Sequence, residues 1–120
     1  MAKRIGKYTL RCETMPAVLG FASVVGKKEG EGPLKDSFDF VGKNSFFGEK
    51  TWEKAEIFLL KKAFQLALEK AALTPADIQY AFAGDLLNQC ISSSFSLRES
   101  GIPFFGLYGA CSTMAESLSL

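Results

Sequence analysis

The chain has 120 residues, of which 48% are hydrophobic and 22% charged, and its formal net charge is +1. This composition is typical of one globular domain or part of one, and the near-neutral charge gives no electrostatic reason to expect a nucleic-acid partner. No window approaches the roughly 18 consecutive apolar residues of a membrane span, and the basic start leads into no apolar stretch, so we expect neither a transmembrane segment nor a signal peptide.

Three segments precede the first long helix. Residues 17–26 are rich in β-branched residues and punctuated by glycine, which predicts a buried first strand. Residues 27–36 combine charges with Gly and Pro, which is typical of an exposed loop. Residues 39–48 carry three phenylalanines between turn-forming residues, so we expect a loop packed onto the core or onto another subunit.

The strongest local pattern predicts a long helix over residues 51–73. Thr51 is a suitable N-cap residue, Glu53 falls in the first turn, and apolar side chains recur at helical spacing from Ile57 onward. Lysines and other polar residues occupy the opposite face. We therefore expect this helix to lie against a sheet with its lysines in solvent.

Strands and helices alternate in the second half. A turn containing proline ends the helix, and residues 78–84 alternate as a second strand would. Residues 87–99 are predicted to form a second helix and residues 102–108 a third strand. The order strand, helix, strand, helix, strand predicts an α/β fold with parallel strands. The apolar spacing of a last helix, from residue 109, continues to Leu120 without a stop signal, so we expect residues 1–120 to be the N-terminal portion of a longer domain.

The candidates for thiol chemistry are Cys12, Cys90 and Cys111. Their odd number and the lack of a CxxC spacing argue against a disulfide framework and against a zinc site, so no metal ligand is predicted. Cys12 lies in a polar stretch and Cys90 at an apolar helix position, and a structural role is expected for both. The sequence contains no histidine, so these residues cannot complete a Cys-His or Ser-His pair, and enzyme activity is left open.

Cys111 stands where a predicted strand passes through a glycine turn into a helix. The partial positive charge of a helix N-terminus favours a thiolate, and the nearby N–H groups can hold an anion or an oxyanion. Acyl transfer and carboxylate binding both use such an arrangement, whereas a lone cysteine after a strand is more often packed in the core. The sequence Gly-Ala-Cys-Ser-Thr at residues 109–113 favours a functional site.

Residues 107–116 resemble the nucleophile elbow of thiolases and β-ketoacyl synthases, with Cys111 at the nucleophile position. Residues 67–78 are similar to the helix, turn and strand that precede this elbow in ketoacyl synthase III-like proteins. The resemblance implies the N-terminal part of a thiolase-like fold, a parallel β-α-β-α-β unit that ends in the elbow helix. Three further segments look most like the stage V sporulation protein AD family, namely residues 20–26, 37–48 and 84–89.

That resemblance implies a thiolase-like fold used for binding. The family belongs to the system that moves dipicolinic acid (pyridine-2,6-dicarboxylic acid), as its calcium chelate, into the developing spore. The implied ligand is dipicolinic acid, and no cofactor is implied beyond the calcium that the ligand carries. The implied partners are other stage V sporulation A membrane proteins, with a peripheral location at the inner membrane of the spore or forespore. Thiolase-like folds usually dimerise, so a homodimer is also expected.

The candidate ligand-binding residues are Asp85, Asn88, Cys111 and Ser112, because ligands of open α/β sheets bind at the carboxyl ends of strands. Asp85 would meet the calcium of the ligand, or simply end a strand in a turn. Asn88 would bind the ligand or cap a helix. Ser112 would donate to a carboxylate or support the first helical turn.

The alternative function is an acyltransferase of the thiolase or β-ketoacyl synthase III type, with Cys111 as its catalytic nucleophile. Such enzymes take His or Asn partners from a second half of the fold, which is not among these residues. A third reading is a purely structural partner of membrane channel proteins.

Overall fold

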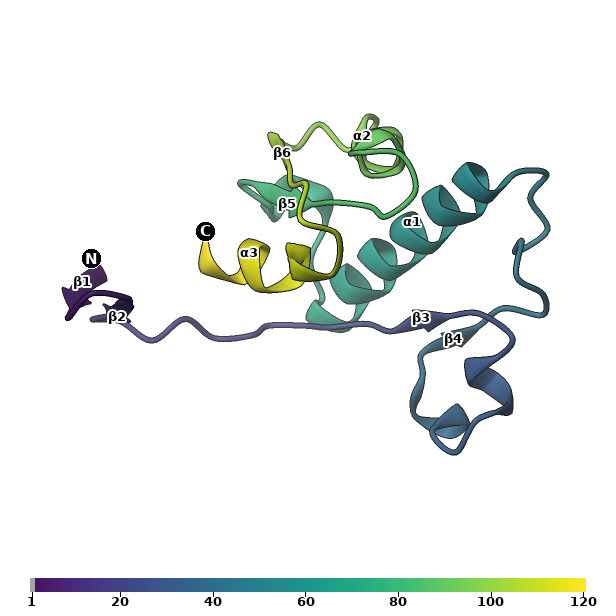
Figure 1. Ribbon diagram of the computed structural model, residues 1–120, viewed down its shortest axis with the longest axis horizontal. Helices are drawn as coiled ribbons and strands as arrows, with labels where there is room; N and C mark the ends of the chain where they lie inside the picture. Colours follow the sequence, from purple (N-terminus) through teal and green to yellow (C-terminus); the bar gives the residue numbers. More distant parts are fainter. Residues whose placement is uncertain (1) are drawn as a thin grey trace.

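The computed structural model describes residues 2–120, and the molecule extends 46 × 32 × 30 Å along its principal axes. Figure 1 shows the cause of this elongation: an N-terminal hairpin stands at one end, joined by a long extended segment to a packed α/β part. Within that packed part, α2, β5 and β6 lie on one side of α1, and β3 and β4 lie on the other.

The hairpin consists of β1 (Ala2–Ile5) and β2 (Thr9–Cys12), which pair in antiparallel fashion. The guanidinium group of Arg4 closes the turn by donating to the carbonyl oxygens of Gly6 and Lys7 at 3.2 and 2.7 Å. Every residue of the two strands is exposed. The sequence did not predict this hairpin because β1 lacks the alternation of apolar and polar residues that marks a half-buried strand, and the alternation in β2 covers four residues only.

β3 (Val24–Val25) and β4 (Phe40–Val41) form a short parallel pair, with two 3-10 turns at Glu29–Glu31 and Lys35–Ser37 between them. The first strand predicted over residues 17–26 is therefore mostly wrong, since only its last part pairs. Residues 13–23 run past α1 without strand pairing. The loop over residues 27–36 is confirmed.

The phenylalanine-rich segment packs onto α1 (Trp52–Ala71), as the sequence suggested. The rings of Phe40 and Phe47 lie 5.8 and 5.3 Å from that of Phe58 on α1, measured between centroids. The expectation that residues 39–48 form only a loop is wrong, because β4 begins at Phe40 and pairs with β3.

α1 confirms the predicted long helix. The hydroxyl oxygen of Thr51 accepts a hydrogen bond from the backbone N–H of Lys54 at 3.3 Å, which is the expected N-cap. The helix ends before Ala72, which is left-handed with φ 54°, so it stops slightly earlier than predicted. Its main neighbour is α2 rather than a sheet. The polar residues expected on its solvent face are exposed, namely Lys54, Lys61, Gln65 and Glu69.

β5 (Ala81–Ala83) and β6 (Phe104–Gly106) pair in parallel and are joined through α2 (Ile91–Leu97). This β-α-β unit was predicted, but α2 is shorter than residues 87–99. Gln89 and Cys90 have positive φ angles of 50° and 70°, which no helix accommodates, so the helix cannot begin before them. A 3-10 turn (Ala110–Ser112) and α3 (Thr113–Ser119) follow β6.

Two short parallel pairs thus replace a single broad sheet in the described residues, because β3 pairs with β4 and β5 with β6. The mixed α/β class with parallel strands is confirmed. A small apolar core joins α1 and α2 to the segments on either side of β6. Its buried apolar residues are Ala55, Leu68, Leu97, Ile102 and Leu107.

Candidate functional site

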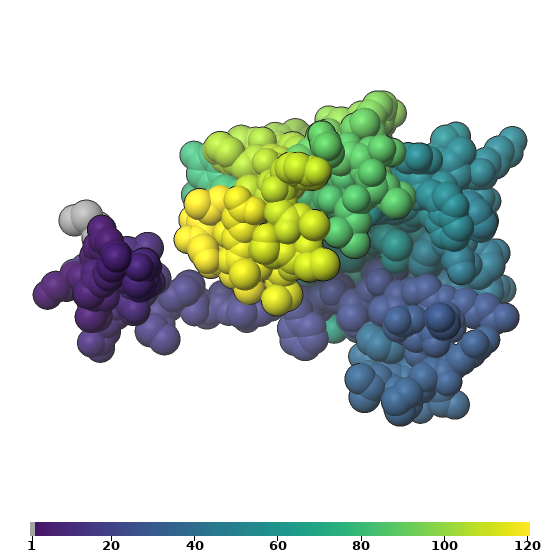
Figure 2. Space-filling model, in the orientation of Figure 1, coloured from purple at the N-terminus to yellow at the C-terminus, as the bar shows by residue number. Residues whose placement is uncertain are grey.

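Two segments begin side by side at the carboxyl ends of β5 and β6, because the two strands are parallel and end on the same side of the pair. Residues 84–90, the 84–90 loop, follow β5, and residues 107–112, the cysteine turn, follow β6. A Cβ atom added to Gly84 would clash with the carbonyl oxygen of Leu107 and lie 2.9 Å from Cγ2 of Thr113. The two segments are therefore in direct contact, and Figure 2 shows the green and yellow regions that contain them side by side on one face.

Cys111 is exposed and lies within the 3-10 turn, one residue short of the Ser112 that precedes α3. The backbone N–H and the hydroxyl of Ser112 both donate to the carbonyl oxygen of Gly109, at 2.9 and 2.6 Å. A helix beginning at the cysteine was expected, but these i to i−3 hydrogen bonds make a tighter turn instead. The thiol is accessible, and the Ser112 hydroxyl supports the turn.

Asp85 is only 6% exposed, and both of its carboxylate oxygens accept hydrogen bonds from the start of α2. Oδ1 accepts from the backbone N–H of Cys90 at 3.1 Å. Oδ2 accepts from the backbone N–H and the hydroxyl of Ser93, both at 2.8 Å. Asp85 therefore lies in the turn after β5, as its structural alternative had it, and its carboxylate also caps α2, a role that had been considered only for Asn88. Its contact with a ligand stays a prediction.

Asn88 is half-buried, and its amide Nδ2 donates to the carboxylate of Glu53 on α1 at 3.2 Å. The side chain does not cap α2; the backbone carbonyl of Asn88 accepts from the N–H of Ile91. The pKa of Glu53 lies below its ordinary value because the carboxylate accepts hydrogen bonds from its own backbone N–H, from the Thr51 hydroxyl and from Asn88. The carboxylate therefore remains ionised in mildly acidic solution.

Further contacts bind the 84–90 loop to the cysteine turn. Nε2 of Gln89 donates to the hydroxyl oxygen of Tyr108 at 3.1 Å, and the thiol of Cys90 donates to the carbonyl oxygen of Leu107 at 3.2 Å. Sequence reasoning had not singled out Gln89 or Tyr108, because nothing local indicates which residues of two separate turns will meet. The structural role expected for Cys90 agrees with its position between α2 and β6.

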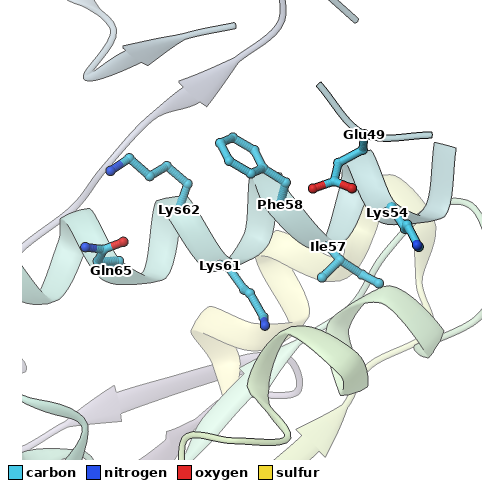
Figure 3. A pocket seen from close by; sticks show the side chains of 7 residues that line it. All are labelled: Glu49, Lys54, Ile57, Phe58, Lys61, Lys62 and Gln65. Atoms are coloured by element: carbon cyan, nitrogen blue, oxygen red, sulfur yellow. The ribbon is translucent and has the colours of Figure 1, made fainter. Parts of the chain in front are cut away.

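A hollow of about 350 Å³ on α1, drawn in Figure 3, contains none of the predicted site residues. One of its lysines, Lys61, pairs with Glu99 at 4.0 Å, and Lys62 lies 5.8 Å from the centre of the Phe40 ring. This lysine-bearing face of α1 is distant in sequence from the cysteine turn, and it matches the solvated face that the sequence predicted. The lining residues are Glu49, Lys54, Ile57, Phe58, Lys61, Lys62 and Gln65.

Two further findings hold for residues 2–120. None of their helices has the length and apolar character needed to cross a membrane. Over the same residues, no three His, Cys, Asp or Glu side chains are gathered in a way that could hold a metal ion.

The fold and site define an α/β protein that exposes one cysteine between a parallel strand and a short helix. Comparison with known proteins gives its family. The sequence model of the family described as Stage V sporulation protein AD matches residues 6–120. Stage V sporulation protein AD of Bacillus subtilis (strain 168) is 38% identical over 118 residues. The chain belongs to the stage V sporulation protein AD family, as its sequence resemblance indicated, and its role therefore lies in sporulation.

The match covers 98% of this chain but 35% of the Bacillus subtilis protein. The chain thus spans about a third of the length of this curated relative.

Proposed function

We propose that the protein binds dipicolinic acid, carried as its calcium chelate, and acts in the uptake of this compound into the developing spore. The observation that carries the proposal is the exposed Cys111 in a turn that contacts the 84–90 loop, in a chain of a sporulation family. Dipicolinate is a flat dianion, and a site for it needs hydrogen-bond donors for carboxylates around an apolar floor.

The four candidate residues take different parts in this proposal. Cys111 forms the floor of the site, and the second N–H of the Asn88 amide, beside the one that Glu53 accepts, donates to a ligand carboxylate. The Ser112 hydroxyl donates to a carboxylate only after it gives up its hydrogen bond to Gly109. Both carboxylate oxygens of Asp85 already accept hydrogen bonds from the start of α2, and the residue is almost fully buried, so little of it is open to a calcium ion. We therefore assign to Asp85 mainly the task of holding the 84–90 loop in place.

The proposal includes a thiolase-like fold for the whole protein, with this chain forming its N-terminal part. The parallel β5-α2-β6 unit followed by a cysteine turn is the element that supports this assignment. The family role also suggests a peripheral location at the spore inner membrane, with other stage V sporulation A proteins as partners, and a homodimer. Gel filtration tests the proposed homodimer, which should elute at twice the mass of the protomer.

The alternative function, acyl transfer by Cys111, is favoured by one observation. The thiol is exposed in a tight turn a few residues after a parallel strand, where a covalent intermediate has room to form. These residues include no histidine, so the base would have to come from another part of the protein.

Thiol alkylation followed by mass spectrometry tests the proposal and separates it from the alternative. Dipicolinate is expected to slow the reaction of Cys111 with iodoacetamide. Cys12 is the internal control, since it is exposed on the hairpin and its rate should not change. Equal rates for Cys111 with and without dipicolinate would contradict the site. A Cys111 adduct formed on incubation with an acyl-CoA would favour the enzyme.

A further inference from the structure

The 84–90 loop is held from a third side by two carboxylates of α1. Oε1 of Glu56 accepts a hydrogen bond from the backbone N–H of Leu86 at 3.0 Å. Oε1 of Glu53 accepts a hydrogen bond from Nδ2 of Asn88 at 3.2 Å. These hydrogen bonds join residues 30 and 35 positions apart in the sequence. Glu53 and Glu56 are three residues apart and therefore lie on the same face of the helix.

The loop needs such support because its backbone is strained. Gln89 and Cys90 are consecutive residues other than glycine with φ angles of 50° and 70°. Left-handed backbone at such residues is unfavourable and persists only where the surrounding structure imposes it. The supporting contacts come from α1, from α2 through Asp85, and from the cysteine turn.

The chemistry of a carboxylate makes the two α1 contacts directional. An ionised carboxylate only accepts hydrogen bonds, so Glu53 fixes the Asn88 side chain with its NH₂ group toward α1. The lowered pKa of Glu53 keeps this acceptor ionised. Glu56 in turn fixes the peptide group before Leu86, next to the capping residue Asp85.

We propose that Glu53 and Glu56 are positioning residues that hold the 84–90 loop against the cysteine turn in the conformation that receives the ligand. The part of this inference that concerns the ligand rests on the proposed binding of dipicolinate. The part that concerns the loop stands on the hydrogen bonds alone. Neither carboxylate is required to touch the ligand.

Three variants of the full chain separate positioning from a general effect on α1. Glu56→Met keeps the length of the side chain but removes the acceptor, whereas Glu56→Gln keeps an acceptor oxygen. Glu69→Met is the matched control, because Glu69 is an exposed residue of the same helix whose carboxylate accepts a hydrogen bond from Gln65 on α1. Each variant is measured by hydrogen exchange at the Leu86 amide and by titration with dipicolinate.

We expect Glu56→Met to speed exchange at the Leu86 amide and to weaken dipicolinate binding, each by about tenfold, the effect typical of losing a hydrogen bond to a charged group. Glu56→Gln should restore both to within about twofold of the parent, since it restores the acceptor. Glu69→Met should leave both unchanged. Glu56→Gln also loses the negative charge, so its rescue would show that the acceptor oxygen matters and not the charge alone.

The two readouts separate failure of this inference from failure of the proposed function. Unchanged Leu86 exchange in Glu56→Met overturns the positioning role whatever the ligand does. If Glu56→Met speeds exchange at the Leu86 amide but the parent protein does not bind dipicolinate, the positioning of the loop is supported and the proposed ligand is wrong. Glu56→Gln behaving like Glu56→Met overturns the assignment of the role to the acceptor oxygen.

Discussion

Replacing Asp85 with alanine should destabilise the protein strongly, apart from any effect on ligand binding. The carboxylate is almost fully buried and accepts three hydrogen bonds, one from Cys90 and two from Ser93. Ser93 itself is 0% exposed, so water cannot readily replace the lost acceptor. Asp85→Ala therefore removes the cap of α2 and leaves buried donors without partners.

The size of the effect follows from these contacts. Loss of a helix cap typically costs about 1 kcal/mol, and a buried donor left without a partner costs about 1–3 kcal/mol. These terms overlap, so we expect the free energy of unfolding to fall by about 3 kcal/mol, which corresponds to a melting temperature about 10 °C lower for a domain of this size. Asp85→Asn keeps one acceptor oxygen and should lose roughly half as much.

Urea denaturation followed by far-UV circular dichroism measures the change. Asp36→Ala is the matched control, because Asp36 is exposed, and exposed substitutions usually stay within about 0.5 kcal/mol. A loss below about 1 kcal/mol for Asp85→Ala would refute the view that this carboxylate holds α2. If the predicted loss is found, weaker ligand binding by Asp85→Ala alone is no proof of a contact between Asp85 and the ligand.

Three other outcomes follow from the geometry. Gly84→Ala should lower the free energy of unfolding by about 1–3 kcal/mol, because its Cβ atom would clash with a carbonyl oxygen of the cysteine turn; an unchanged urea midpoint would contradict the close contact. Cys111 should react with iodoacetamide well before Cys90, whose thiol is half-buried and hydrogen-bonded, and mass spectrometry that finds the reverse order would reject the exposed turn. The pKa of the Asp39 carboxyl lies below its ordinary value, mainly because the Lys70 ammonium group donates a hydrogen bond to it at 2.8 Å. The stability that this ion pair contributes is therefore present above the ordinary pKa of the carboxyl, and it is lost as the pH falls through the lower pKa of the folded state. Urea midpoints should accordingly fall between about pH 5 and pH 3, and Lys70→Met should make that fall smaller.

Local signals in the sequence were sufficient for the elements that are locally determined. Thr51 caps α1 because its hydroxyl meets an N–H three residues later, and this depends on neighbouring residues only. The β5-α2-β6 unit was also predicted, since each element carries its own periodicity. The family, too, could be predicted from short segments, and the comparisons confirm it.

Features that depend on contacts between distant residues could not be predicted in the same way. β4 lies within a segment that the sequence predicts to be a loop. Its pairing with β3 involves only two residues of each strand, which is too short to produce a strand pattern in the sequence. Glu53 was placed correctly in the first turn of α1, but its hydrogen bond to Asn88 crosses 35 residues. The 3-10 turn at Cys111 likewise depends on the hydroxyl of Ser112 bonding to Gly109, which competes with a regular helix start.

Calorimetric titration of the protein with calcium dipicolinate tests the central claim most directly. Cys111→Ala and Ser112→Ala are suitable variants, because both residues are exposed and their substitution should not unfold the protein. Ser112→Ala also removes the hydrogen bond to Gly109 that supports the cysteine turn, so Cys111→Ala is the more direct variant. The account predicts saturable heat for the parent, weaker binding by both variants, and no saturable signal with an acyl-CoA. Absence of binding by the parent, together with covalent labelling of Cys111 by the acyl-CoA, would contradict the account.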